Sequence, residues 1–121
     1  MNKEPINIKD KLSKFSDHWS PKVIAEMNDY QFKLVKVQGE FVWHSHKHTD
    51  EVFIVVEGVL NIEFNDGSVT LRPGEMFVVP KGIEHKPWSE SECKLMLVEP
   101  KGVVNTGEVK SELTAANDVW V

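Results

Sequence analysis

Residues 39–58 read GEFVWHSHKHTDEVFIVVEG, and this stretch decides how the chain is expected to fold. Its second half holds the apolar run Val52 to Val56, which is rich in β-branched residues and short enough to be a buried strand. Because the run has no polar alternation, we expect both faces of the strand to be covered. One face would line a barrel interior. The other would meet a second sheet or a second subunit, and a homodimer would cover it economically.

The first half of this stretch places charged and metal-ligating groups next to that strand. His44 and His46 are two residues apart, so on an extended chain they point to the same side. Glu51 lies at odd spacing from both, so the chain must turn through residues 47–50 before Glu51 begins the next strand, on the same face as Phe53. A carboxylate that enters an apolar interior is costly unless it is paired with a cation. A metal ion would supply that cation.

A second stretch, residues 74–89, reads GEMFVVPKGIEHKPWS and contributes one more histidine. A strand is expected to end at Pro80, Gly82 allows a tight bend, and His85 follows. Three imidazoles and one carboxylate suit Fe(II), Mn(II), Ni(II), Co(II), Cu(II) or Zn(II) better than Ca(II) or Mg(II). An octahedral ion with four protein ligands keeps two positions for water, dioxygen or a bidentate substrate. The predicted ligands of this divalent transition metal are His44, His46, Glu51 and His85.

The rest of the chain predicts an all-β protein with a short helical arm. Breaks at Gly58, residues 65–67, 72–74 and 80–82 divide it into short strands with no helical period between them, as in an antiparallel sandwich or barrel. Two further strands are expected at residues 22–27 and 30–37. Ile8, Leu12 and Phe15 have helical spacing, so the arm formed by residues 1–21 is expected to hold one amphipathic helix over 8–15.

The two stretches resemble the two sequence motifs of the cupin superfamily, with 39–58 as the first motif and 74–89 as the second. Fifteen residues separate them, as in small microbial cupins. The resemblance implies a single cupin domain over residues 1–121. It also implies a jelly-roll β-barrel, or double-stranded β-helix, and a metal held by the four positions named above. The chain departs from the pattern in having four residues between Gly39 and His44 rather than five, and Ser89 where the second motif usually ends in Asn.

Composition limits the partners and the compartment. A formal net charge of -5 and a pI near 5.5 give no reason to expect nucleic acid, which needs clustered Lys and Arg. No apolar run is long enough to span a bilayer, so no membrane association is expected. The single cysteine, Cys93, forms no internal disulfide, and the polar start of the chain is unlike a secretory signal. We therefore expect a cytoplasmic protein.

The resemblance favours a metal-dependent enzyme that acts on a small chelating organic substrate, as a dioxygenase, isomerase, decarboxylase or lyase. The alternative is a non-catalytic barrel that binds or senses a small molecule or a metal. A sugar-phosphate isomerase is less favoured, because the expected interior positions show no basic cluster. The catalytic residues, if there are any, are not predicted.

Several other residues have two interpretations. His48 is read as an exposed histidine at the barrel mouth, Cys93 as a buried structural thiol, and Glu84 as a surface carboxylate rather than a partner of His85. A group of large side chains flanks the motifs and could line a ligand pocket or simply pack the core: Trp43, Phe53, Met76, Phe77 and Trp88.

Overall fold

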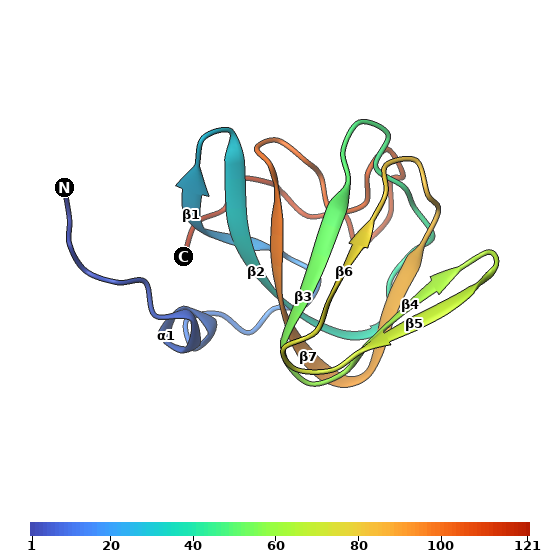
Figure 1. Ribbon diagram of the computed structural model, residues 1–121, viewed down its shortest axis with the longest axis horizontal. Coiled ribbons are helices and arrows are strands. Elements are labelled where there is room, and N and C mark those ends of the chain that lie inside the picture. The colour runs from blue at the N-terminus through green and yellow to red at the C-terminus, as the bar shows by residue number, and fades with distance from the viewer.

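The protein is an antiparallel β structure with one short helix, described by a computed structural model over residues 1–121 (Figure 1). Every strand pairing is antiparallel, as expected for a jelly-roll barrel. The elements are α1 (Ile8–Leu12), β1 (Lys22–Met27), β2 (Tyr30–Glu40), β3 (Glu51–Glu57), β4 (Leu60–Phe64), β5 (Gly67–Leu71), β6 (Met76–Val79) and β7 (Lys86–Pro100).

Strand β7 organises the sheet, because it pairs with three other strands. The main order is β1-β2-β7-β3-β6, and β4 pairs with the first part of β7 and with β5. The hairpin β4–β5 therefore joins the sheet through the first part of β7, at the right-hand side of Figure 1. Because one sheet curls on itself to form the barrel, alternate side chains of its strands line the interior.

The interior is filled by residues of one parity on each strand. Val35, Leu95 and Val55 lie side by side on β2, β7 and β3, and each is no more than 4% exposed. Leu60 and Ile62 of β4 are fully buried in the same cluster. The alternation of buried and exposed positions is the pattern of a sheet with one face toward the core.

Gly58, at the end of β3, is required by a close backbone approach. Its φ is +89°, and a Cβ there would lie 2.8 Å from the Glu92 carbonyl oxygen and 2.9 Å from the Cys93 Cα. Both atoms belong to the backbone of β7, so a side chain could be accepted only if the two strands separated. This contact explains the glycine that ends the first motif.

The predicted helix and the predicted second strand were misjudged at their ends. Helix α1 begins at Ile8 and is capped by Asn7, whose side chain accepts from Asp10 N–H, but it ends at Leu12 rather than continuing to Phe15. Ser13 donates its hydroxyl to the Asp10 carbonyl, a local bond that competes with helix continuation. Strand β2 runs on to Glu40 because its last residues pair with the first part of β7. No helix of the protein is both long and apolar enough to cross a membrane.

Of the two covers expected for the outer face of β3, the second sheet is absent from this chain, and the second subunit stays a prediction. The inward residues Phe53 and Val55 are buried, whereas the outward Val52 and Ile54 are half-buried and Val56 is 37% exposed. The chain covers only one corner of that outer face, where Leu12 of α1 packs against β1 and β2.

Candidate metal centre

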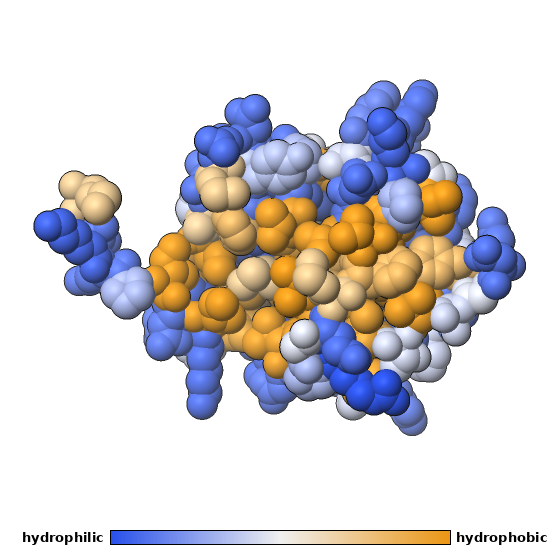
Figure 2. All heavy atoms as spheres, viewed as in Figure 1, coloured by the Kyte–Doolittle hydropathy of each residue, from blue (hydrophilic) through white to orange (hydrophobic).

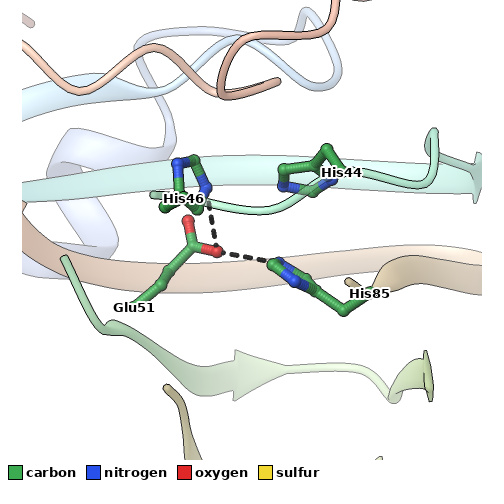
Figure 3. Close-up of side chains that lie close together, drawn as sticks. All are labelled: His44, His46, Glu51 and His85. Carbon is green, nitrogen blue, oxygen red and sulfur yellow. Dashed lines mark hydrogen bonds and ion pairs between the residues drawn. The ribbon is translucent and has the colours of Figure 1, made fainter. Parts of the chain in front are cut away.

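The four predicted ligands come from three places in the sequence, and the structure brings them together. His44 and His46 lie on the segment between β2 and β3, Glu51 begins β3, and His85 immediately precedes β7. A pair of backbone hydrogen bonds between His44 and His85, of 3.0 and 2.9 Å, joins two of these places. In Figure 3 the four side chains point toward one another, and their ligand atoms all lie within 4.8 Å.

Hydrogen bonds to backbone carbonyls orient two of the rings. The Nδ1 of His44 lies 2.9 Å from the Val42 oxygen, and that of His85 lies 2.8 Å from the Ile83 oxygen. Since a carbonyl only accepts, each Nδ1 must carry the proton, which leaves a lone pair on Nε2 in the neutral ring. Such bonds to the distal nitrogen are typical of metal-binding histidines.

The Nε2 atoms of His85 and His46 both face the carboxylate of Glu51. Oε1 of Glu51 lies 3.1 Å from His85 Nε2 and 3.3 Å from His46 Nε2, and the His46 nitrogen has no hydrogen-bond partner. Lone pairs at these distances repel unless a proton or a metal ion lies among them. Donor atoms at about 2.1 Å from one ion and at right angles to each other are about 3 Å apart. The residues therefore fit a transition-metal ion.

Burial and the neighbouring charges tune the protonation of this group. Burial, followed by the nearby His85, lowers the pKa of His44 to about 4. Burial opposes charging of Glu51 as well, but its close contacts with His46 and His85 prevail and lower its pKa to about 2. In return Glu51 raises the pKa of His46 against the effect of burial. At neutral pH the group thus offers an ionised carboxylate and a neutral His44, as metal binding requires.

A second buried carboxylate extends this polar region along the barrel wall. Glu99 lies on β7 at the level of Glu51, and its Oε1 accepts a 2.9 Å bond from Lys33, with both side chains about 97% buried. Burial and then the charge of Glu51 raise the pKa of Glu99 to about 7. Gln31, directly opposite Glu99, donates to Glu26 and Asp118 at the surface. A polar row therefore runs from the predicted metal site to the exterior.

The other side of the site opens onto a small, mostly apolar cavity. His44 and Glu51 form its polar wall, and Trp19 and Phe41 are stacked along it with ring centroids 4.6 Å apart. The remaining walls are mostly aliphatic or aromatic: Pro21, Val35, Val37, Phe53, Pro87, Leu95, Leu97 and Asn105. An apolar cavity with a few converging polar groups is the usual form of a small-molecule site.

The carboxyl-terminal segment lies against the ligand-bearing loop. Gly107 is so close to Ser45 that a Cβ at position 107 would lie 2.2 Å from the Ser45 carbonyl oxygen and 3.7 Å from Nδ1 of His46. Asn105 of the same segment donates from its side-chain amide to the carbonyl of Trp19 in the amino-terminal arm. The same amide also donates to the carbonyl of Leu113, further along the segment. The segment therefore helps to enclose the site.

Several residues with open interpretations can now be placed. His48 and Glu84 are exposed, and Cys93 is fully buried, where burial raises the pKa of its thiol to about 12. Of the large side chains that flank the motifs, Phe53 lines the cavity, while Trp43 and Met76 are 42% and 56% exposed.

The sequence interpretation missed two groups of residues. Gln31 and Lys33 share parity with Val35 and Val37, and Glu99 shares parity with Leu97, so strand alternation could have placed them inside. Trp19 and Phe41 carry no such signal. They belong to segments that reach the cavity only through the tertiary fold.

Comparison with known proteins agrees with this architecture. The sequence model of the cupin domain family (Cupin_2) matches residues 32–99, which include all four predicted ligands. A crystal structure of a cupin-2 domain protein from Shewanella frigidimarina is 67% identical. It covers 79% of this chain and 94% of its own, with a TM-score of 0.79. The chain belongs to the cupin domain family.

Two further proteins are similar to most of this chain. The structure of protein NMB1881 from Neisseria meningitidis is 43% identical over 81% of this chain and 100% of its own, with a TM-score of 0.74. The uncharacterized protein YdbB of Bacillus subtilis is 36% identical over 78% of each chain.

Proposed function

We propose that this cupin is a metal-dependent enzyme that acts on a small organic substrate with an apolar body and two adjacent oxygen atoms. One observation carries the proposal: His44 and Glu51 belong both to the metal-ligand cluster and to the wall of the apolar cavity. A substrate in the cavity would therefore lie against the predicted metal position.

The ion would be held by the Nε2 atoms of the three histidines and by a carboxylate oxygen of Glu51. A bound Fe, Mn, Ni, Co, Cu or Zn ion supplies Lewis acidity and, for the redox-active metals, electron transfer. The backbone carbonyls of Val42 and Ile83 keep two of the rings in the ligating tautomer.

The cavity supports a substrate that is largely apolar. Trp19, Phe41 and Phe53 offer ring surfaces, and Leu95 and Leu97 complete the wall. Burial in this space excludes water and strengthens the interaction of any polar substrate group with the site. The reaction classes that match this arrangement are oxygenation, isomerisation, decarboxylation and elimination at carbons next to the chelating oxygens.

The metal site is tested by elemental analysis of protein purified without a histidine tag. Wild-type protein should contain about one equivalent of a transition metal, and His46→Ala and His85→Ala should lose it. His48→Ala is the matched control, because His48 is an exposed histidine of the same segment and should leave the metal content unchanged. Equal metal in all four proteins would refute the proposed ligand set.

Enzyme and binding protein are then separated by product analysis. Metal-loaded protein would be incubated with small catechols, hydroxyacids and diketones, with and without dioxygen. Conversion that disappears in His85→Ala supports the enzyme. A compound that raises the melting temperature of the loaded protein and is recovered unchanged favours the alternative function, a small-molecule binding barrel.

A further inference from the structure

The predicted metal ligands are almost completely shielded from solvent. His44 and His85 are each 1% exposed, Glu51 is 4% exposed and His46 is 6% exposed. The cavity beside them is also enclosed by buried side chains, among them Phe53 and the other apolar wall residues. A metal ion or an organic ligand can therefore reach this site only if part of the surrounding wall moves.

Most of this wall is fixed by backbone hydrogen bonds. The ligand-bearing segment is joined to the start of β7 by the paired bonds between His44 and His85, and the Gly82 N–H donates 2.9 Å to the His46 carbonyl. The strands are paired with their neighbours, and Figure 2 shows their outer side chains as a continuous surface without a hollow. Movement of these elements would break the sheet or separate the ligands from one another.

One stretch of the wall lacks such bonds. Residues 102–117, which we call the strap, contain no helix or strand, and only Thr106 among them is buried. The two ends are anchored: the Lys101 N–H donates to the Asp29 carbonyl, and Val23 pairs through its backbone with Val119 and with the last residue of the chain. Between these anchors no backbone–backbone hydrogen bond joins the strap to the barrel. In Figure 1 it is the red stretch that returns from β7 toward β1.

Two side-chain hydrogen bonds connect the strap to the rest of the protein. Lys33 donates to the Val103 carbonyl over a long 3.4 Å. The Asn105 amide donates to the Trp19 carbonyl over 2.9 Å, and Trp19 is itself a wall of the cavity. The same amide donates 2.8 Å to the Leu113 carbonyl, so it also holds two parts of the strap together. Asn105 is therefore the main polar contact that keeps the strap in place.

Asn105 also lies at the junction of two cavities. It lines the apolar cavity beside the predicted metal site and a smaller cavity under the strap, and Pro21 is the other residue that both share. The smaller cavity extends to Ala116 and Asp118, which are exposed. Release of Asn105 would join the two cavities and open a path from solvent to the site.

We propose that the strap is a gate over the metal site and its cavity, and that the Asn105 side chain is the latch of this gate. In the closed state the latch holds Gly107, two residues away, against Ser45. In the open state the strap leaves the barrel while its ends stay bonded, and a metal ion or a small organic ligand passes beneath it. Closure excludes water from the site, as lids and loops do in enzymes.

A latch has a kinetic signature that a ligand-positioning residue lacks. Uptake and release of the metal both pass through the open state, so a weaker latch should raise both rates by the same factor and leave the dissociation constant unchanged. A residue that positions the ligands would instead raise the dissociation constant. The expected factor is roughly tenfold, which corresponds to the loss of one or two hydrogen bonds of ordinary net strength.

Stopped-flow measurement of zinc uptake and of zinc release to excess chelator tests the latch on the full, untagged chain. Asn105→Ala should accelerate both roughly tenfold. Asn105→Asp should do the same, because it keeps the acceptor for the Ala115 N–H but loses both amide bonds. Asn117→Ala is the matched control and should behave as wild type, since the Asn117 amide donates only to Gly102, within the strap.

Three results of these measurements would overturn the proposal. The first is wild-type rates in Asn105→Ala. The second is faster release with a raised dissociation constant, which would make Asn105 a ligand-positioning residue. The third is equal acceleration in Asn117→Ala, because the latch would then not be specific to Asn105.

A second test does not depend on the metal, whereas the zinc measurements rest on the proposed function. Lys110 is an exposed residue of the strap, and trypsin can cleave after it only when the strap leaves the barrel and extends. Cleavage of metal-free protein should be roughly tenfold faster in Asn105→Ala than in wild type or Asn117→Ala, because proteolysis follows the population of the open state. Equal cleavage rates in the three proteins would refute the gate. A wild-type protein that takes up no zinc would refute the metal site alone, and cleavage would then decide on the gate.

Discussion

Gly107→Ala should weaken metal binding even though Gly107 is not one of the predicted ligands. The new Cβ would lie 2.2 Å from the Ser45 carbonyl oxygen, and ordinary contact requires a retreat of roughly 1 Å. Ser45 stands between His44 and His46, and His44 is held in place by its backbone pairing with His85. The displacement should therefore fall largely on His46.

The expected magnitudes follow from this geometry. Metal–ligand distances tolerate about 0.2 Å, so a shift of this size should reduce metal affinity about 10- to 100-fold. The φ of +63° adds a conformational cost of roughly 1–2 kcal/mol, and the overlap adds about 1–3 kcal/mol to the loss of folding free energy.

Gly102→Ala is the matched control for this prediction. Gly102 lies in the same segment with a φ of +94°, but a Cβ there meets nothing within 4 Å. Gly102→Ala should lose only the folding free energy that the positive φ costs, and its metal affinity should stay unchanged. The assays are competitive titration with a fluorescent zinc chelator and urea unfolding of the metal-free proteins. Equal metal affinity in the two variants would refute the reasoning, because the segment would then have moved away from Ser45 without disturbing the ligands.

Three further predictions concern buried polar groups. Lys33→Met should destabilise the protein by about 3 kcal/mol at pH 8, where the buried Glu99 must then either carry an unpaired charge or take up a proton, but much less at pH 5, where Glu99 is already protonated in the wild type; urea unfolding at both pH values tests this, and similar losses would contradict it. The free energy of unfolding of the metal-free protein should fall by about 2 kcal/mol between pH 7 and pH 5, and that of His44→Gln should fall by correspondingly less. The reason is that the pKa of His44 is about 4 in the folded protein, below the ordinary 6.5, so the unfolded chain takes up the proton first; urea unfolding at the two pH values measures the difference. Cys93, fully buried and with a pKa of about 12, should react with a thiol reagent at pH 8 only after denaturant is added; rapid labelling of native protein would count against it.

Much of the architecture was predictable because it depends on short-range patterns. The strand at residues 22–27 has the predicted ends, since the turn at Asn28 and Asp29 fixes both it and the start of β2. The inward direction of Glu51 followed from its parity with Phe53. Convergence of His85 with the other three residues depended instead on the family resemblance, because no local rule brings residue 85 next to residue 44.

The cavity walls and the end of β2 could not be predicted, because they depend on contacts between residues that are far apart in the sequence. The cavity walls Trp19 and Phe41 meet because the backbone N–H of Trp19 donates to the Lys36 carbonyl of β2, and nothing in their spacing indicates it. The end of β2 was placed too early, at Val37. The structure keeps the strand paired through Gly39, opposite Ser89, after a shift in register.

The apolar run of β3 has one set of residues that faces the interior and another that faces outward. Glu51, Phe53 and Val55 face the metal site and the core, whereas Val52, Ile54 and Val56 face outward, so one strand serves two surfaces. A slip of one residue against β7 would turn Glu51 to the exterior and Val52 toward the interior, so the predicted metal site would lose its carboxylate. Metal binding by Glu51 would therefore favour the native register and stabilise the pairing of β3 with β7.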